Sequence, residues 1–599
     1  MFTLDPLYLI DFYKAGHFAQ YPTNTKEIFD NFTPRSSRTY HKQILWTGTK
    51  PIITWLNKLW KENFFEKDIN DICNKYQKFM DICLGTKNFD VKHLRDLHAL
   101  GYLPLEIKAL PEGTLVPLQI PVFTILNTHP AGYWLPNYLE SFLSAEMWKA
   151  PTTATTAYGF RKRFEDFAKI TGANKDFIKW QGHDFAFRGM SGAIDSITSD
   201  MAHLALFTGT DTVSTAFAIE EVYGDSWEQN LICGSVPATE HSVMCSNIGL
   251  IEKQITNGDL PKVEGIESDK MLAEYYTFKR LINEVYPSGL VSIVSDSFDY
   301  FGVNTTILPL LKEDIMNRQG RVIIRPDSGD PVEVICGKNV IEDKNYLTSV
   351  DDIKDFFYEQ FDNDIELGED ECGAENSYIA KIGNRFYNVN CVGEYVKECG
   401  GYSGNDYYTL DDVKVTYSEI TDKTELCKII GTFENLWNIF GGTINEKGYK
   451  VLDTHIGLIY GDSITEERQE EILKRLSEKG FTADNLVLGI GSYSYQYVTR
   501  DTYGFAMKAT NSVTTVDGKD IVTAIYKDPK TDDNKFSKKS AKGYLKVIKD
   551  CDGNLKLVDQ ITKEEMYADD NELKTVFKDG ECFFTDTFMD IRHRIDRLF

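Results

Sequence analysis

Two short segments combine aromatic, charged and glycine residues in a way that could bind a small planar ligand. HDFAFRGMSG (183–192) brings Phe185 and Arg188 together with two glycines, and FTGTDTVSTAFA (207–218) places Asp211 before an apolar helix. Each segment also has a purely structural interpretation. An Asp–Arg pair can simply hold a loop in place, and Asp211 can serve as a helix N-cap. The residue types alone therefore leave ligand binding and structural roles as alternatives.

Histidine and carboxylate side chains follow in two further segments. GSVPATEHSVMC (234–245) contains Glu240 and His241 after a turn with proline, and VSIVSDSFDYF (291–301) ends an apolar strand at Asp296. A single histidine is more often structural than catalytic, so this pattern taken by itself favours a structural His241. Asp296, at the end of a strand, is a stronger candidate for a functional site.

The sequence RVIIRPDSGDP (321–331) is the most informative short stretch of the chain. Arg325, Asp327 and Ser328 follow a four-residue apolar strand, and Gly329 comes directly after them. Proline keeps the backbone extended and glycine permits a tight turn, so the arginine and the aspartate are expected to project together from the strand end. The alternative is a simple Asp/Gly turn.

Weaker signals lie near the ends of two later apolar runs. Small residues there let a ligand approach the backbone, and basic residues beyond them could bind phosphate, with surface ion pairing as the common alternative. These candidates are Gly461 and Asp462 in YGD, Gly491 and Ser492 in GIGS, and Arg500 and Lys508 in TRDTYGFAMK. The sequence contains no H-E-x-x-H, P-loop, G-x-S-x-G or paired metal-binding cysteines, which excludes the standard protease, kinase and zinc-enzyme signatures.

Four continuous apolar runs position most of these candidates. Such runs, alternating with helical stretches, are typical of parallel strands that helices cover on both faces. Because an α/β barrel or an open α/β sheet forms its site at the carboxyl ends of its strands, we expect an α/β fold of one of these kinds. The runs are GLVSIVSD (289–296), RVIIRPD (321–327), HIGLIYGD (455–462) and NLVLGIG (485–491).

The residues after the third run predict the start of a helix. Ser463 can cap it and Glu466 can cap back, with Ile472, Leu473 and Leu476 on its buried stripe.

Composition narrows the class of protein. The 599 residues carry a net charge of -26, which argues against a sequence-independent nucleic-acid binder and against binding to an anionic membrane. A small anionic substrate in a locally basic pocket stays possible. The eleven scattered cysteines contain no C-x-x-C pair, the N-terminus lacks a signal-peptide pattern, and no apolar run reaches the length of a membrane span. We therefore expect a cytoplasmic protein with free thiols.

Two segments depart from the average charge. Residues 342–371 contain twelve Asp/Glu and two Lys, whereas residues 527–549 contain eight Lys and three Asp. The first belongs to a stretch that interrupts the alternation of helices and strands, so we expect it to be an inserted subdomain. The predicted division is an N-terminal α+β domain (1–150), an α/β catalytic domain (151–336 and 436–500), the acidic insertion (337–435) and a β-rich C-terminal segment that packs with the N-terminal domain (501–599).

Taken in order, these motifs resemble the nicotinamide phosphoribosyltransferases, which are type II phosphoribosyltransferases. The resemblance covers about 1–336 and 436–599 and rests on DFYKAGHFAQYP, GYLPLEIKALPEGTLVP, HDFAFRG, GTDT, SVPATEH, VSDS, IIRPDSG, YGD, TRD and KDPKTDDNKFSKK. It implies an irregular α/β barrel with an additional β-rich α+β domain. It also implies the condensation of nicotinamide with phosphoribosyl pyrophosphate in NAD salvage, in a homodimer with two sites at the subunit interface.

The resemblance assigns a role to each candidate. Phe185 and, from the partner subunit, Tyr13 would stack on the pyridine ring, and Asp211 would accept a hydrogen bond from the carboxamide. His241 would be phosphorylated by ATP, with Glu240 placed to orient its ring. Around the ring, ribose and pyrophosphate it implies Arg188 and Arg325 beside the ring and phosphates, Asp327 and Ser328 at the ribose, and Asp296, Gly461 and Asp462 along the ribose and pyrophosphate. At the 5′-phosphate it implies Gly491, Ser492, Arg500 and Lys508. Arg35 would reach the phosphates from the neighbouring subunit, and Asp11 would lie beside Tyr13. ATP would be a co-substrate and Mg²⁺ the cofactor, held mainly by pyrophosphate.

Two features depart from the family pattern. Ser492 stands where a second glycine of the phosphate loop is expected, so its side chain either narrows access to the backbone or itself binds phosphate. The insertion at 337–435 is much longer than the family's connection, and its role does not follow from the resemblance.

Three alternatives stay open at this point. Nicotinate phosphoribosyltransferase would use the same chemistry, but Asp211 would repel a substrate carboxylate. A catalytically silent binding protein is disfavoured because every charged catalytic position is present. A barrel glycosidase that uses Asp296 and Asp327 would leave the Arg/Lys set without a role.

Overall fold

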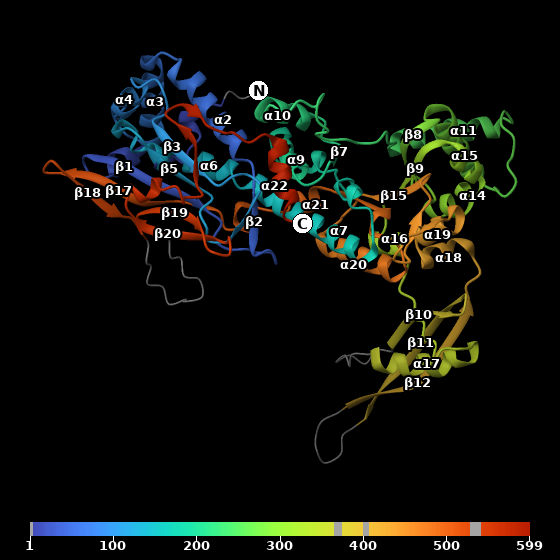
Figure 1. Cartoon of the computed structure of the whole chain (residues 1–599). Helices are drawn as coiled ribbons and strands as arrows, with labels where there is room; N and C mark the ends of the chain where they lie inside the picture. The colour runs from blue at the N-terminus through green and yellow to red at the C-terminus, as the bar shows by residue number, and fades with distance from the viewer. Residues whose placement is uncertain (1–3, 365–373, 399–406, 527–540) are drawn as a thin grey trace.

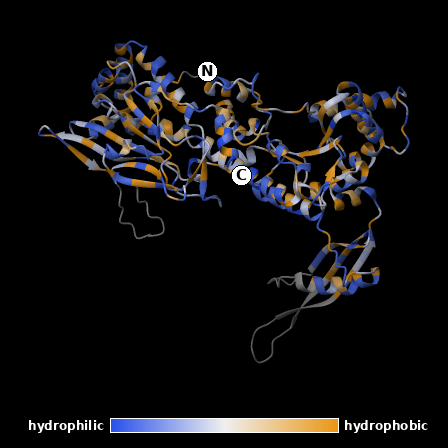
Figure 2. Ribbon diagram, viewed as in Figure 1, coloured by the Kyte–Doolittle hydropathy of each residue, from blue (hydrophilic) through white to orange (hydrophobic). Residues whose placement is uncertain are grey.

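Two large β-sheets, each with its own hydrophobic core, make up most of the molecule (Figure 1). The computed structural model describes residues 4–364, 374–398, 407–526 and 541–599. Figure 2 shows hydrophobic and hydrophilic residues mixed along the helices. Within the described residues, every helix is too short or too polar to cross a membrane.

The first sheet contains six parallel strands and includes all four predicted apolar runs. Its central strand β15 is buried at every position, as expected for a strand with helices on both faces. In spatial order the strands are β7 (Gly209–Thr210), β6 (Gly182–Asp184), β16 (Leu486–Ile490), β15 (Ile456–Tyr460), β9 (Gln319–Arg325) and β8 (Ser288–Val294). The four strand predictions are therefore confirmed, whereas β6 and β7 are too short to be recognised as apolar runs.

An extended segment between the two edge strands curls this sheet into a barrel. Gly209 on β7 forms a parallel bridge with Gly234, and Ala238 forms one with Ser292 on β8. The amide of Ser292 donates to Pro237 O at 2.8 Å. The SVPATEH motif thus lies between β7 and β8, and the expected irregular α/β barrel is confirmed.

Helices cover the barrel and complete its core. Long helix α7 packs on α9 and α20, and α11 packs on α12. The covering helices are α7 (Lys149–Thr171), α9 (Ala193–Leu204), α10 (Ser214–Tyr223), α11 (His241–Thr256), α12 (Asp269–Arg280), α16 (Pro331–Cys336), α18 (Lys423–Ile430), α19 (Thr432–Phe440), α20 (Glu466–Glu478) and the last helix, α22 (Phe588–Asp596). Phe588, Ile591 and Ile595 of α22 belong to the barrel core.

The second sheet joins the two ends of the chain. Its order is β18 (Lys519–Ala524), β17 (Ala506–Val516), β1 (Thr25–Thr33), β5 (Phe123–Asn127), β3 (Leu105–Ala109), β21 (Lys574–Lys578) and β22 (Glu581–Cys582). The C-terminal strands β17 and β21 pair antiparallel with the N-terminal strands β1 and β3. Helices α2 (Thr49–Trp60), α3 (Ile69–Leu84) and α4 (Lys92–His98) contribute to the same core, as do two antiparallel strand pairs, β2 (Gln43–Trp46) with β4 (Thr114–Pro117) and β19 (Tyr544–Lys549) with β20 (Leu555–Ile561).

A separate small sheet lies beyond α18 and α19 (Figure 1). It consists of β10 (Ala374–Ile382), β11 (Arg385–Glu398) and β12 (Tyr407–Glu419), and α17 (Ile353–Asp364) packs on it. Ile353, Phe357, Tyr387 and Val389 form part of its own core. The end of the acidic stretch, 365–371, and most of the lysine-rich stretch, 527–540, lie outside the described residues.

Helix α20 begins differently from the prediction. Thr465, not Ser463, is the N-cap, and its hydroxyl accepts from the amide of Arg468 at 3.2 Å. Ser463 has a left-handed backbone (φ 53°) and points its hydroxyl to Asp462 at 2.9 Å. The predicted stripe of Ile472, Leu473 and Leu476 is buried and is confirmed.

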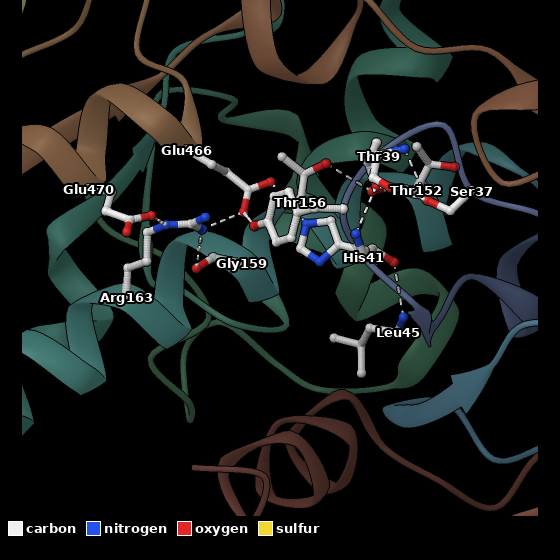
Figure 3. A network of polar contacts seen from close by, with 12 residues as sticks. Ser37, Thr39, His41, Leu45, Thr152, Thr156, Gly159, Arg163, Glu466 and Glu470 are labelled. Atoms are coloured by element: carbon white, nitrogen blue, oxygen red, sulfur yellow. Dashed lines mark hydrogen bonds and ion pairs between the residues drawn. The ribbon is translucent and has the colours of Figure 1, made fainter.

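Glu466 is drawn away from the cap by a polar network that ties three segments together (Figure 3). Its carboxylate accepts from Arg163 of α7 at 2.6 Å, lies 3.0 Å from His41 Nε2, and also accepts from the Tyr40 hydroxyl. The side chains of His41, Arg163 and Glu466 are all at most 16% exposed, so water screens this network little. It joins α20 and α7 to the segment that carries Tyr40.

This network makes Gly159 on α7 intolerant of a side chain. A Cβ at Gly159 would lie 1.8 Å from Glu466 Oε2. Alanine gains roughly 0.5–1 kcal/mol of helix propensity, but displacing a mostly buried carboxylate from its partners costs about 1–3 kcal/mol. We therefore expect Gly159→Ala to lower the free energy of unfolding by about 1–2 kcal/mol in urea denaturation. Gly249→Ala on α11, where a Cβ meets nothing within 4 Å, is the control and should be neutral or stabilising; equal effects of the two changes would contradict this role of Glu466.

Candidate active site

Asp296 joins the ends of two neighbouring barrel strands. It follows β8, and its Oδ2 accepts from the amide of Asp327 at 2.9 Å and from the hydroxyl of Ser328 at 2.7 Å. Its side chain is only 4% exposed, whereas Asp327 and Ser328 are exposed. One carboxylate therefore fixes the loop after β9, and Asp327 is left free to face a ligand.

The same loop is held from two further directions. Arg325, at the end of β9, donates from Nη2 to Thr239 O at 2.7 Å, which ties β9 to the SVPATEH segment. The hydroxyl of Tyr460, the last residue of β15, donates to Gly329 O at 2.8 Å. Asp462 follows two residues later and is exposed. The ends of β8, β9 and β15 thus present carboxylates and an arginine at one edge of the barrel.

His241 is the first residue of α11 and lies beside Asp296. Its Nδ1 is 3.3 Å from Ser297 Oγ and its Nε2 is 3.7 Å from Asp296 Oδ1. Glu240, expected to orient this ring, instead accepts a hydrogen bond from the Ser242 hydroxyl. The reason is that Glu240 is the extended N-cap residue of α11. The carboxylate beside the imidazole is therefore that of Asp296.

Phe185 lies across the backbones of two glycines. A Cβ at Gly461 would lie 2.7 Å from its ring, and a Cβ at Gly489 would lie 2.2 Å from it. Its amide donates to Ile490 O at 3.0 Å, and its ring centre is 4.7 Å from that of His183. Glycine at 461 and 489 is thus required for the position of Phe185, and one face of the ring can take a planar ligand.

Asp211 is fixed as an ionised acceptor at the end of β7. Its Oδ1 lies 3.0 Å from His183 Nε2 and accepts from the Ser235 hydroxyl at 2.7 Å. Burial raises its pKa, but these two hydrogen bonds and the charge of Arg325 outweigh burial and lower the pKa below its ordinary value. A cavity of about 340 Å³ shares His183 and Ser235 with this site, and its other walls come mainly from β9, β15 and β16.

The loop with Gly491 and Ser492, predicted to bind phosphate, contacts the turn that carries Arg188. Gly491 is the N-cap of the short helix α21 (Ser492–Tyr495), and a Cβ at Gly189 would lie 2.0 Å from Ser492 Oγ. Ser492 therefore packs against a glycine that leaves room for its side chain. Arg188 lies in the same turn, Phe187–Gly189, and is exposed.

Three predicted site residues lie around Glu140 at the start of α6 (Glu140–Glu146). Lys508 on β17 is 3.4 Å from this carboxylate. Tyr13, in the 3-10 helix Phe12–Gly16, is 63% exposed, its pKa is raised by burial and by the charges of Asp11 and Glu140, and Asp11 Oδ2 accepts from Ser141 at 2.5 Å. These residues form a second group around Lys508 of the seven-stranded sheet, whereas Phe185 and Asp296 follow strands of the six-stranded sheet.

Arg35 follows β1 and contacts residues 503–504, and Arg500 precedes these residues between β16 and β17. Arg35 is exposed, donates from Nε to Gly504 O at 3.1 Å, and from its amide to Tyr503 O. Arg500 begins the short 3-10 helix Arg500–Thr502, and its guanidinium is 3.3 Å from Asp501.

Comparison with known proteins identifies the family. The model of the nicotinate phosphoribosyltransferase (NAPRTase) family matches residues 180–361 and 403–581. The chain belongs to this family. It is therefore an enzyme of the pentosyltransferase class, and the suspected kinship with type II phosphoribosyltransferases is confirmed.

Individual relatives agree with this assignment. The chain is 38% identical to a nicotinamide phosphoribosyltransferase of Acinetobacter baylyi, over 99% of this chain and 97% of that protein. It is 27% identical to one of Mycoplasma pneumoniae, over 85% and 89% of the two chains. The crystal structure of human nicotinic acid phosphoribosyltransferase gives a TM-score of 0.45 and 12% identity over 98% of this chain and 93% of that chain, and this likeness carries no weight in the assignment.

Several site residues were not predicted individually. His183 and Ser235 hold Asp211, Ser297 lies beside His241, and Gly489 accommodates Phe185. Each stands within or next to a motif that the sequence does single out, so the signal was position in the motif rather than residue type.

Proposed function

We propose that this enzyme is a nicotinamide phosphoribosyltransferase, which condenses nicotinamide with phosphoribosyl pyrophosphate to give nicotinamide mononucleotide and pyrophosphate for NAD salvage. The observation that carries the proposal is the acceptor Asp211, held by His183 and Ser235 at the end of the barrel where the ring of Phe185 lies. An ionised carboxylate suits the amide donor of nicotinamide and disfavours the carboxylate of nicotinic acid. The relative from Acinetobacter baylyi has the same name.

The chemistry asks for positioning and charge stabilisation rather than a general base. The pyridine nitrogen of nicotinamide has a free lone pair and attacks C1 of the ribose as pyrophosphate leaves. Asp327 and Asp462 can stabilise positive charge that develops on the ribose, and Arg188 and Arg325 can face the ring and phosphates. The loop after β9, which Asp296 and Tyr460 fix, holds Asp327 in place before the substrate binds.

Mg²⁺ and ATP complete the proposal. Among the described residues, no three His, Cys, Asp or Glu side chains converge to hold a metal ion, so the residues fit an ion that arrives bound mainly to pyrophosphate oxygens, with Asp327 and Asp462 exposed to it. Bound in this way, Mg²⁺ would neutralise charge on the leaving group. ATP would phosphorylate His241, which is half exposed and lies at a helix N-terminus, where negative charge is stabilised.

Amide preference is the first expectation. Steady-state assays should give a higher kcat/KM with nicotinamide than with nicotinic acid, because Asp211 accepts from the amide and repels the acid. Asp211→Ser should reduce the preference by about tenfold or more, which corresponds to roughly 1.4 kcal/mol or more. An exposed carboxylate remote from the site, changed in Asp355→Ser, serves as control. A wild-type preference for nicotinic acid would support the nicotinate enzyme instead, and no product with either substrate would support a silent homologue.

Phosphorylation of His241 is the second expectation. Incubation with γ-labelled ATP should give an acid-labile label on the wild-type protein, and stimulation of the reaction by ATP should accompany it. His241→Ala should lose both the label and the stimulation, whereas His129→Ala, at an exposed histidine, should keep them. A label that persists in His241→Ala would contradict this assignment.

We also propose a homodimer whose sites are completed by the partner subunit. Tyr13 and Asp11 lie near Glu140, as does Lys508 on β17 of the seven-stranded sheet, whereas Phe185 and Asp296 follow β6 and β8 of the six-stranded sheet. Figure 1 shows these two sheets as separate parts of the molecule. Tyr13 is largely exposed despite its aromatic ring, as expected for a residue that stacks on a ligand in a second copy.

Complementation between subunits tests the dimer. Tyr13→Ala and Asp296→Ala should each be nearly inactive, since each damages both sites of its own homodimer. Co-expression of the two variants should restore about one quarter of wild-type activity, because half of the dimers are mixed and each contains one intact site. Two variants that both change the barrel group, Asp296→Ala and Asp211→Ala, form the control and should not complement. Restoration by that control pair, or a monomer by light scattering, would contradict shared sites.

A further inference from the structure

Two carboxyl groups are buried together beneath the proposed nicotinamide site. Asp184 ends β6 and is 1% exposed, and Asp200 on α9 is 0% exposed. Burial raises the pKa of both, and the neighbouring Asp184 charge raises that of Asp200 further. Among the described residues, neither oxygen of Asp200 has a partner at full hydrogen-bond geometry. An ionised carboxylate in this position would be strongly disfavoured.

The cations near α9 are engaged elsewhere. Lys149 donates to Tyr495 O at 2.7 Å and lies 3.6 Å from Asp195 at the first turn of α9. Arg592 donates to Leu204 O at the other end of α9. Among the described residues, neither Asp184 nor Asp200 forms an ion pair with a lysine, arginine or histidine. A shared proton is therefore the remaining way to remove one of the two negative charges.

Asp184 organises the chain on both sides of the site. Its Oδ1 accepts from the amide of Ala186 at 2.6 Å, which bends the chain at Phe185 into the turn with Arg188. Its main-chain oxygen accepts from the amide of Asp211 at 3.0 Å. One residue therefore sets the positions of both Phe185 and Asp211.

Asp200 faces the other side of the Asp211 loop. The hydroxyls of Thr215 and Thr210 lower the pKa of its carboxyl group, whereas the neighbouring Asp184 raises that pKa. Thr210 precedes Asp211 and accepts from the amide of Thr212 at 2.9 Å, and Thr215 is fully buried. The Asp184–Asp200 pair thus stands between the turn that carries Phe185 and the loop that carries Asp211.

One turn further along α9, His203 extends the same polar face to the phosphate loop. Its Nε2 is 3.0 Å from Gly209 O and its Nδ1 is 2.7 Å from the Tyr495 hydroxyl. Burial lowers its pKa to about 3, so the ring is neutral: Nε2 donates to the carbonyl and Nδ1 accepts from Tyr495. The buried face of α9 therefore contacts β6, β7 and α21.

We propose that Asp200 is a positioning residue that works in its protonated form and shares one proton with Asp184, so that the Phe185 turn and the Asp211 loop are held in register. This role rests on the proposed function, because Phe185 and Asp211 are the residues assigned to nicotinamide. Loss of the proton would place two carboxylates side by side in the core and loosen the ring site more than the ribose and phosphate site around Asp296.

Three variants of α9 test the role in catalysis. Asp200→Asn keeps a neutral donor and should leave the KM for nicotinamide within about threefold of wild type. Asp200→Ala removes the donor and should raise that KM about tenfold or more, with a smaller change in the KM for phosphoribosyl pyrophosphate. Asp195→Asn, on the first turn of the same helix, is the matched control. An unchanged nicotinamide KM in Asp200→Ala, or an Asp200→Asn variant as impaired as Asp200→Ala, would overturn the proposal.

The proton itself is tested on the folded protein without substrates. Burial also raises the pKa of Glu274 to about 8 and that of Asp30 to about 7, so these groups add carboxylic acid bands to every variant. The wild-type minus Asp200→Asn difference spectrum at neutral pH should therefore contain the infrared carbonyl band of one protonated carboxylic acid, and the wild-type minus Asp195→Asn difference spectrum should lack it. Since the folded protein binds a proton that the unfolded chain has released, the free energy of unfolding should fall as pH rises through the raised pKa of Asp200. Asp200→Asn should show a shallower fall.

Other titratable groups near the pair contribute equally to wild type and to the variants, so they do not affect the comparison between them. The titratable groups near the pair are His183 and Asp211 beside Asp184, Tyr495 from α21 and Cys233, and all of them are retained in the variants. A wild-type minus Asp200→Asn difference spectrum without the carboxylic acid band, or equal slopes for wild type and Asp200→Asn, would overturn the shared proton. If wild type makes no nicotinamide mononucleotide, the proposed function fails, yet the infrared band and the slope still decide the proton. If Asp200→Ala does not fold, the infrared spectrum and the pH dependence of unfolding of Asp200→Asn decide whether Asp200 shares the proton.

Discussion

The site depends on how Asp296 joins β8 to β9. Parallel strands bring their carboxyl ends to one edge of a sheet, but the loops that follow are free to diverge unless something fixes them. Asp296 supplies that constraint, because its Oδ2 binds both the amide of Asp327 and the hydroxyl of Ser328. Its other oxygen faces His241. The imidazole of His241 therefore lies beside the same carboxylate that holds the Asp327 loop.

The sequence predicts the central strands of the barrel and their polar ends because both signals are local. A run such as VIIR followed by Pro and Asp needs no distant partner to be recognised, and β8, β9, β15 and β16 lie where the runs place them. Strands β6 and β7 contain three and two residues and carry no such signal. They are recognisable only through the HDF and GTD motifs that follow or overlap them.

Side-chain partners were harder to predict, because they depend on contacts between distant segments. Glu240 precedes His241, but the backbone of a helix N-cap turns its carboxylate to Ser242, and Asp296, 55 positions after His241, lies beside the imidazole instead. Likewise Glu466 has the capping-box spacing from Ser463, yet Thr465 caps α20 and the Glu466 carboxylate contacts Arg163, His41 and Tyr40 instead. Ser492 replaces an expected glycine, and the structure accommodates it against Gly189, a residue 303 positions earlier.

The insertion illustrates how a long segment can enter a barrel without disturbing it. It leaves the chain after α16, the short helix that follows the Asp327 loop, and the chain returns through α18 to Gly431. Gly337 and Gly431 both have left-handed backbones, at φ 87° and φ 84°, and a Cβ on Gly337 would lie 2.1 Å from Ile429 O. The segments that enter and leave the insertion are in contact here, so the insertion spans only a short gap in the barrel domain. Its length therefore adds little to the entropy cost of closing the chain. The core around Phe357 and Val389 is separate from the barrel core, so the described part of the insertion packs on itself rather than on the barrel.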